Sequence, residues 1–392
     1  MNATPNSFRR NWAGLMVPAI LALALFADGL SRFLSLDHFT IRAWEAMTRN
    51  AFTEGGVPLE PSKHFDKDRS YGDLAAMSNR PELREYHREV FSTDRFGYRN
   101  PDTFSRTNPP DAILIGTSFS VGCGVSDDQN LAVRLGARTG QRIYNGAGSP
   151  PSPDQANAIA GRFGMKKGTV FYEQLEPIGF PSPPPPISRV KQICYDRLGE
   201  ACLRLKGWLS ISPVEILSRR AYHWLEDDVW LPNSLGAGWV PVPVDGAPML
   251  FSESGITPCP GVTPEHARDY FRWFRDKLGG LDLFVILAPS KFMVYGSLTD
   301  ANRDRPAESV NAGASAARSC FATMGRALDE LGIPYVNLTE PLHQAARDAL
   351  ARRQLIYFRG DTHWNAAGID IAAGVIGDAW SSSRHRPVGR DP

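Results

Sequence analysis

The sequence has almost no excess of either charge and few cysteines, and both shortages exclude classes of protein. Its 392 residues hold 43 Lys and Arg against 42 Asp and Glu, for a formal net charge of +1. Nucleic-acid-binding domains usually carry a basic excess, so no nucleic-acid partner is expected. Five cysteines without a C-x-x-C pair argue against a disulfide scaffold and give no zinc or thioredoxin motif. We therefore expect no metal and no cofactor.

Long apolar runs are also scarce, and the one near the N-terminus bears on localisation. It spans Trp12–Ala27 after two arginines, and apolar residues between Leu30 and Leu36 extend its character. As a helix the run is about 24 Å long, against about 30 Å for a bilayer core. We expect residues 1–36 to form a signal-anchor with its basic end in the cytoplasm, which places the rest of the chain in a bacterial periplasm, anchored to the inner membrane. A cleaved signal peptide, releasing a secreted protein, and a buried N-terminal helix are the alternatives.

Short apolar segments alternate with helical patterns over most of the remaining chain. Strands are expected at residues 111–115, 141–145, 168–172, 283–287 and 335–338. Helices are expected at 127–138, 152–163, 264–278, 308–331 and 340–352, with a last one from Ala366. This alternation predicts an α/β fold with a doubly wound parallel sheet and flavodoxin-like layering.

The same alternation divides the chain into regions. We expect an N-terminal extension over 37–110, helical and then loop-like to residue 63 and polar and turn-rich beyond it, and an α/β domain over 111–380 that carries the candidate site. A proline-rich stretch and a hairpin-like segment from Val240 to Phe251 indicate an insertion at about 180–260. Residues 381–392 are expected to form a loose tail.

Two segments bring nucleophile chemistry to the edge of this sheet. Ser118 follows the first strand in a Gly-Thr-Ser turn, and ligands of open α/β sheets bind outside the carboxyl ends of the strands. A serine hydroxyl needs a base, which His363 in the loop before the last helix can supply, with Asp361 orienting the ring. Each residue also has an ordinary reading, as a capping serine, a packed histidine or an N-cap aspartate. Jointly they predict a catalytic triad of Ser118, His363 and Asp361.

Acyl transfer also requires hydrogen-bond donors for the oxyanion. The backbone N–H of Ser118 is one candidate, and Gly146 or Gly148, after the second strand, is another. Turn geometry alone also explains glycines at these two positions. Glu173, after the third strand, is expected to line the cleft.

These segments resemble the SGNH (GDSL-type) hydrolase superfamily. Residues 116–119 look like its first block, residues 144–148 like its second, and residues 361–364 like its last. The Asp-x-His-Trp form of the last block is similar to the branch containing the alginate O-acetyltransferases and related exopolysaccharide acetylation proteins, and a single N-terminal anchor is shared with it. Lys291 and Tyr295, just after a strand, resemble a further motif of that branch.

The resemblance implies site residues as well as partners. It points to Lys291, Tyr295 and Trp364 as candidates for substrate contact, although an ordinary loop lysine and a packed tyrosine fit the sequence too. It also implies a membrane-bound O-acyltransferase that supplies acetyl groups. In the first block, Thr117 occupies the usual place of Asp. Three departures stand beside the resemblance: the Gly-x-Asn-Asp block is absent, the Asp-x-His segment follows the serine, so alginate itself is not implied as the substrate, and no separate carbohydrate-binding domain is expected after Trp364.

Together these features predict an exported O-acetyltransferase that acetylates an extracellular polysaccharide through an acyl-serine intermediate. A carbohydrate esterase or deacetylase would use the same triad, because water and a sugar hydroxyl compete for the same intermediate. A non-catalytic polysaccharide-binding scaffold is the alternative from another class.

Overall fold

The computed structural model describes residues 5–31, 61–76, 81–148, 151–175, 239–252, 262–302 and 320–385, together with a few isolated positions. Most of the insertion expected at about 180–260 and the tail beyond His385 lie outside these ranges.

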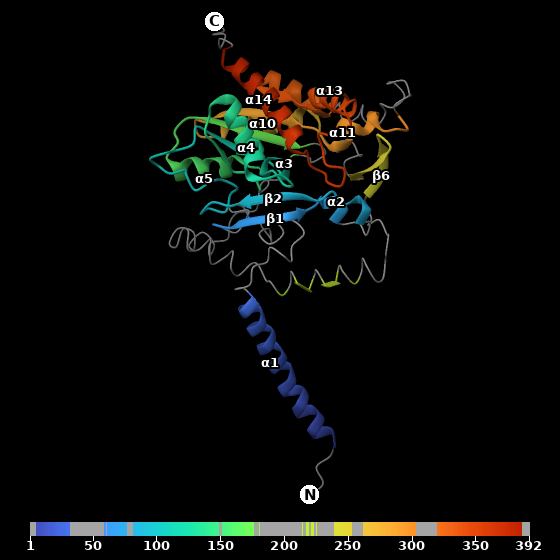
Figure 1. The fold of residues 1–392 in the computed structure, drawn as a ribbon. Coiled ribbons are helices and arrows are strands. Elements are labelled where there is room, and N and C mark those ends of the chain that lie inside the picture. The colour runs from blue at the N-terminus through green and yellow to red at the C-terminus, as the bar shows by residue number, and fades with distance from the viewer. Residues whose placement is uncertain are drawn as a thin grey trace.

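A five-stranded parallel sheet forms the centre of the α/β fold (Figure 1). Its strands lie in the order β4-β3-β5-β8-β9, and every neighbouring pair is parallel. Their bounds are β3 Ala112–Ile115, β4 Ile143–Asn145, β5 Thr169–Leu175, β8 Asp282–Ala288 and β9 Tyr335–Asn337. The first connection leads from β3 outward to β4, and the next returns across β3 to β5. The direction of winding therefore reverses between β3 and β5, where open α/β sheets form their ligand crevice.

Helices cover both faces of this sheet, which explains why its strands are almost continuously apolar. Ala112 and Leu114 of β3 pack into one core cluster, whereas Ile113 and Ile115 pack into another on the opposite face. The first face is covered by α4 Leu131–Thr139, α11 Lys291–Tyr295, α13 Thr339–Leu350 and α14 Ala366–His385. The second is covered by α5 Pro153–Phe163, α10 Pro264–Asp276 and the helical residues 320–330.

Side-chain caps begin several of these helices at the places where the sequence changes from turn to helix, α4, α5 and α10 among them. Asn130 accepts a hydrogen bond from the Val133 N–H at α4, Ser152 from Gln155 at α5, and Thr263 from His266 at α10. Such a cap satisfies a backbone donor that has no partner inside the helix, and its loss typically costs about 1 kcal/mol.

The N-terminal extension is more regular than its polar sequence indicates. Strands β1 His64–Ser70 and β2 His87–Ser92 pair antiparallel, and they flank α2 Asp73–Ala76 and a 3-10 turn at Pro81–Leu83. The facing residues Phe65 and Phe91 are buried against Val121 and Cys123, in the segment that follows Ser118.

A second ribbon packs against α2. It consists of β6 Trp239–Val244 and β7 Ala247–Ser252, which pair antiparallel as the hairpin-like sequence indicated. Leu74 and Ala75 of α2 pack in one cluster with Leu250 of β7. The extension therefore rests against both the segment after Ser118 and the domain's own hairpin.

The structure corrects the prediction of an N-terminal membrane anchor. The first helix, α1 Pro5–Ser31, contains Pro18, and its apolar run ends at Asp28 after about 24 Å, short of a bilayer core of about 30 Å. Over the part of the chain that the structure describes, no helix has the length and apolar character needed to cross a membrane. The prediction of a signal-anchor over 1–36, and of a periplasmic localisation derived from it, is therefore wrong.

Candidate active site

Ser118 opens a very short helix directly after the central strand β3. Helix α3 spans Ser118–Val121, with Thr117 as its N-cap, whose hydroxyl accepts from the Phe119 N–H at 3.3 Å. At the other end, the Gly122 N–H donates to the Ser118 carbonyl at 3.1 Å in a left-handed conformation. The Ser118 side chain is half-buried, with its backbone fixed at both ends of this turn.

A buried carboxylate lies beneath this turn. Glu173 of β5 accepts from the Thr117 N–H at 2.7 Å, the Thr117 hydroxyl at 3.0 Å and the Ser120 hydroxyl at 3.0 Å. Burial raises the pKa of Glu173, and the hydrogen bonds from Thr117 and Ser120 oppose that shift. A Cβ on Gly116 would lie 2.4 Å from the carboxylate, which is why the turn needs glycine there. Glu173 thus holds the turn through hydrogen bonds, and because it is fully buried it does not line a cleft.

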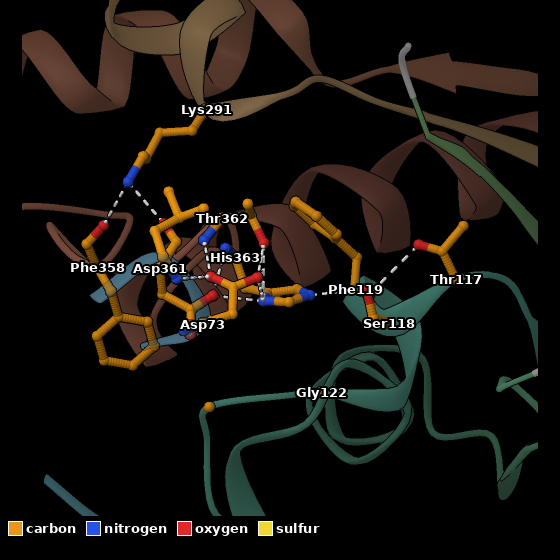
Figure 2. Close-up of polar contacts among 12 residues, drawn as sticks. Asp73, Thr117, Ser118, Phe119, Gly122, Lys291, Phe358, Asp361, Thr362 and His363 are labelled. Atoms are coloured by element: carbon orange, nitrogen blue, oxygen red, sulfur yellow. Dashed lines mark hydrogen bonds and ion pairs between the residues drawn. The ribbon is translucent and has the colours of Figure 1, made fainter. Parts of the chain in front are cut away.

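The loop before α14 presents the imidazole to Ser118 (Figure 2). His363 Nε2 lies 2.7 Å from Ser118 Oγ, and His363 Nδ1 lies 2.5 Å from Asp361 Oδ1. The same carboxylate oxygen accepts the His363 N–H at 2.9 Å, so Asp361 holds both the ring and the backbone of the histidine. Both residues are almost completely buried, at 2% exposed for Asp361 and 4% for His363.

This geometry fixes the tautomer of the imidazole. An ionised carboxylate can only accept, so the proton is on Nδ1 and the Nε2 lone pair faces the serine hydroxyl. Ser118 Oγ–H can therefore donate to Nε2, which is the arrangement that activates a serine nucleophile. The three side chains come from opposite ends of the domain, and Ser118 and His363 are 245 positions apart in the sequence.

Lys291, expected to contact substrate, instead donates hydrogen bonds to the backbone of this loop. Its buried ammonium donates to the carbonyls of Phe358 and Arg359 at 3.0 Å each and of Asp361 at 2.6 Å. Burial lowers the pKa of Lys291 to about 8, and the charge of Asp361 is the largest contribution opposing that shift. All three N–H donors of the ammonium are directed at the backbone of the catalytic loop.

The other expected site residues lie in the core or in the ladder of the sheet. The Tyr295 hydroxyl accepts from the Ile356 N–H at 2.9 Å, and Trp364 packs edge-on against Phe119 with ring centroids 5.2 Å apart. The Gly146 N–H donates to the Leu114 carbonyl at 2.7 Å, and the Gly148 N–H to the Gly116 carbonyl at 3.4 Å. Of the oxyanion candidates named from the sequence, the Ser118 N–H is the one left without a protein acceptor among the described residues.

Asp73 of α2 is a residue at this site that the sequence analysis missed. One ligand atom from each of Asp73, Asp361 and His363 falls within 4.8 Å of the others, a spacing that a metal ion could also use. Both nitrogens of His363 already face other partners, Asp361 and Ser118, so we read the group as a hydrogen-bond network. An aspartate between a glycine and a short apolar segment gives no sequence signal for such a position.

Comparison with known proteins identifies no family. No family model and no curated protein matches the sequence, so the branch that its motifs resemble rests on those motifs alone. Among solved structures, a GDSL-like lipase from Parabacteroides merdae is similar at 11% identity and a TM-score of 0.33, over 69% of this chain and 95% of the lipase. LAE5, an α/β hydrolase from the metagenome of Lake Arreo in Spain, is similar at 11% identity and a TM-score of 0.31, over 69% and 93%.

Proposed function

We propose that the protein is a serine-dependent enzyme that cleaves a carboxylic ester through an acyl-serine intermediate. The single observation that carries this proposal is the continuous chain of contacts from Asp361 through His363 to Ser118, at 2.5 and 2.7 Å. A hydroxyl, an imidazole and a carboxylate in this order allow the imidazole to act as a general base for the serine. The side chain of Ser118 is partly exposed, so an ester can reach it.

Each residue then has a defined role. Ser118 Oγ attacks the acyl carbon while its proton passes to His363 Nε2, and Asp361 stabilises the imidazolium that forms. The Ser118 N–H is the donor for the oxyanion. On collapse of the tetrahedral intermediate, His363 returns the proton to the departing alcohol, which leaves the acyl group on Ser118. A second hydroxyl compound, deprotonated by His363, attacks the acyl carbon, and Ser118 Oγ leaves and takes the proton back from His363.

The identity of that second hydroxyl separates a transferase from an esterase. The motifs favour a polysaccharide hydroxyl as acceptor and an acetyl group as cargo, with water as the competing acceptor. Incubating the protein with p-nitrophenyl acetate, with and without oligosaccharides, distinguishes the two. Acetylated sugar identifies a transferase, whereas acetate alone identifies an esterase.

The Ser118→Ala variant tests the mechanism. We expect nitrophenol release by the variant to fall by at least ~10⁴-fold, with an unchanged far-UV spectrum and melting temperature. Ser381→Ala, at an exposed position of α14, is the matched control and should keep full activity. A serine-directed phosphonate should label the wild type and leave Ser118→Ala unlabelled. Glycan binding without labelling or turnover by the wild type would establish a binding scaffold instead.

A further inference from the structure

A second carboxylate reaches the catalytic loop from the N-terminal extension. Asp73, at the start of α2, accepts from the Thr362 N–H at 2.8 Å and from the Thr362 hydroxyl at 2.6 Å. In the opposite direction, the Asp73 N–H donates to Asp361 Oδ2 at 3.0 Å (Figure 2). The residue between Asp361 and His363 is therefore held through its backbone and its side chain, while Asp361 is held through the oxygen that does not face His363.

Asp73 lies close to the imidazole without touching it. Asp73 Oδ2 is 4.0 Å from His363 Nδ1, and the two side chains are 14% and 6% exposed. The proton on Nδ1 goes to Asp361 at 2.5 Å, so Asp73 acts on the ring through its charge and through Thr362. Water screens an interaction at this depth far less than it screens a surface pair.

Three carboxylates and one ammonium surround this group of residues. Asp361 of the His363 loop, Asp73 of α2 and Glu173 of β5 act on the imidazole, whereas the ammonium of Lys291 in α11 interacts with the charges of Asp361 and Asp73. Lys291 directs its ammonium at the carbonyls of residues 358, 359 and 361 and donates no hydrogen bond to the imidazole. The positive charge that develops on His363 during attack is thus met by carboxylates.

The backbone packing gives the contact a fixed geometry. The Ala75 N–H donates to the Gly360 carbonyl at 2.8 Å, directly beside the site. A Cβ on Gly72 would lie 2.2 Å from the Gly360 oxygen and 2.6 Å from Asp361 Cβ, so the two segments are in van der Waals contact. Helix α2 cannot shift along the loop without breaking these contacts.

We propose that Asp73 is a positioning residue for the catalytic base, and that the N-terminal extension is therefore part of the active site. This inference rests on the proposed function. Asp73 holds Thr362 through its carboxylate and Asp361 through its backbone N–H, and its charge favours the imidazolium form of His363. An opposite charge within about 4–6 Å typically shifts a pKa by one unit or more towards the charged form.

The Asp73→Asn variant removes the charge and keeps the shape of the side chain. We expect kcat/KM at the pH plateau to fall by about 10- to 100-fold. We also expect the acid limb of the pH profile to move down by about one unit, because the imidazole of the variant holds its proton less tightly. The matched control is Asp66→Asn, an exposed aspartate of β1 in the same extension, whose profile should overlay that of the wild type.

Thr362→Val is the second variant, because it keeps the charge of Asp73 while removing the hydroxyl that donates to Asp73 and lies 3.3 Å from His363 Nδ1. It should lower the plateau and leave the acid limb in place. An equal loss in both variants, with no movement of the limb in Asp73→Asn, would show that Asp73 merely caps the loop and would overturn the proposal. So would an Asp73→Asn profile identical to the wild type.

A titration of the His363 ring by NMR separates this inference from the proposed function. The His363 signal is identified by its absence in His363→Gln, and its midpoint should fall by about one unit in Asp73→Asn. The titration needs no turnover. An inactive wild type that still shows the shift would refute the ester-cleaving function and support the role of Asp73, whereas an active wild type without the shift would refute the role alone.

Discussion

Replacing Lys291 with methionine tests whether the catalytic loop depends on a buried ammonium. The substitution keeps the length of the side chain but removes three donors from the carbonyls of residues 358, 359 and 361. A buried carbonyl without a partner costs about 1–3 kcal/mol. Against this, the drop in the pKa of Lys291 from 10.5 to about 8 represents a burial penalty of roughly 3 kcal/mol, at about 1.4 kcal/mol per unit, that the variant no longer carries.

The two effects oppose each other and leave a net loss of about 3 kcal/mol in the free energy of unfolding, taking about 2 kcal/mol for each carbonyl. The loss of activity should be larger than this implies, because the freed carbonyls belong to the loop that carries Asp361 and His363. We expect kcat/KM for p-nitrophenyl acetate to fall at least ~100-fold. Urea denaturation gives the stability, and Lys167→Met, at an exposed lysine, is the control.

The pH dependence of the wild type checks the same reasoning. The folded-state pKa of about 8 lies below the unfolded value of 10.5, so the burial penalty is fully present below pH 8 and is relieved as the pH rises towards 10.5. Stability from this group therefore increases through that window. Activity should decrease over it, since a neutral amine offers two donors to three carbonyls. Wild-type kcat/KM in Lys291→Met would refute the role of the Lys291 ammonium in holding the catalytic loop. Equal activity of the wild type at pH 7 and pH 9.5 would refute it as well.

Two other substitutions probe the supports of the site. Glu173→Gln places an amide N–H₂ among donors from Thr117 and Ser120. The free energy of unfolding should therefore fall by about 2–3 kcal/mol, and nitrophenol release should fall with it. The control is Glu330→Gln, which alters a surface ion pair with Arg268 and should change neither quantity. Gly72→Ala would set a Cβ 2.2 Å from the Gly360 oxygen and should lower kcat/KM by at least ~10-fold, whereas Gly161→Ala, with no atom within 4 Å, should be silent in the same assay.

The strands of the sheet could be predicted from the sequence because the pattern that identifies each of them is local. Each buried strand is a short apolar run bounded by turns, so the strand expected at 111–115 differs from β3 Ala112–Ile115 by a single residue. The order of the chain then brings Ser118 and the loop of His363 to one edge, because carboxyl ends of parallel strands share that edge. The outermost helix was harder to delimit, as α14 continues to His385, beyond the expected domain end at 380.

The roles of the residues that support the site could not be predicted from the sequence, because they depend on tertiary contacts. A lysine after a strand carries the same sequence signal whether it meets solvent or, like Lys291, the backbone of a distant loop. Strand β1 escaped notice because its residues His64–Ser70 bury just the second and last positions, which leaves no regular alternation. Asp73 follows that strand, so the segment that carries it had no predicted structure to place it.

The distance along the chain between hydroxyl and imidazole has a consequence during synthesis. A ribosome adding about 5–20 residues per second completes the 245 residues from Ser118 to His363 in roughly 12 to 50 seconds. Throughout that interval the growing polypeptide carries an ordinary alcohol with no partner to deprotonate it. On the proposed mechanism, unfinished or prematurely terminated chains are inert towards cellular esters, and reactivity appears when the last loop docks onto a sheet that is already formed.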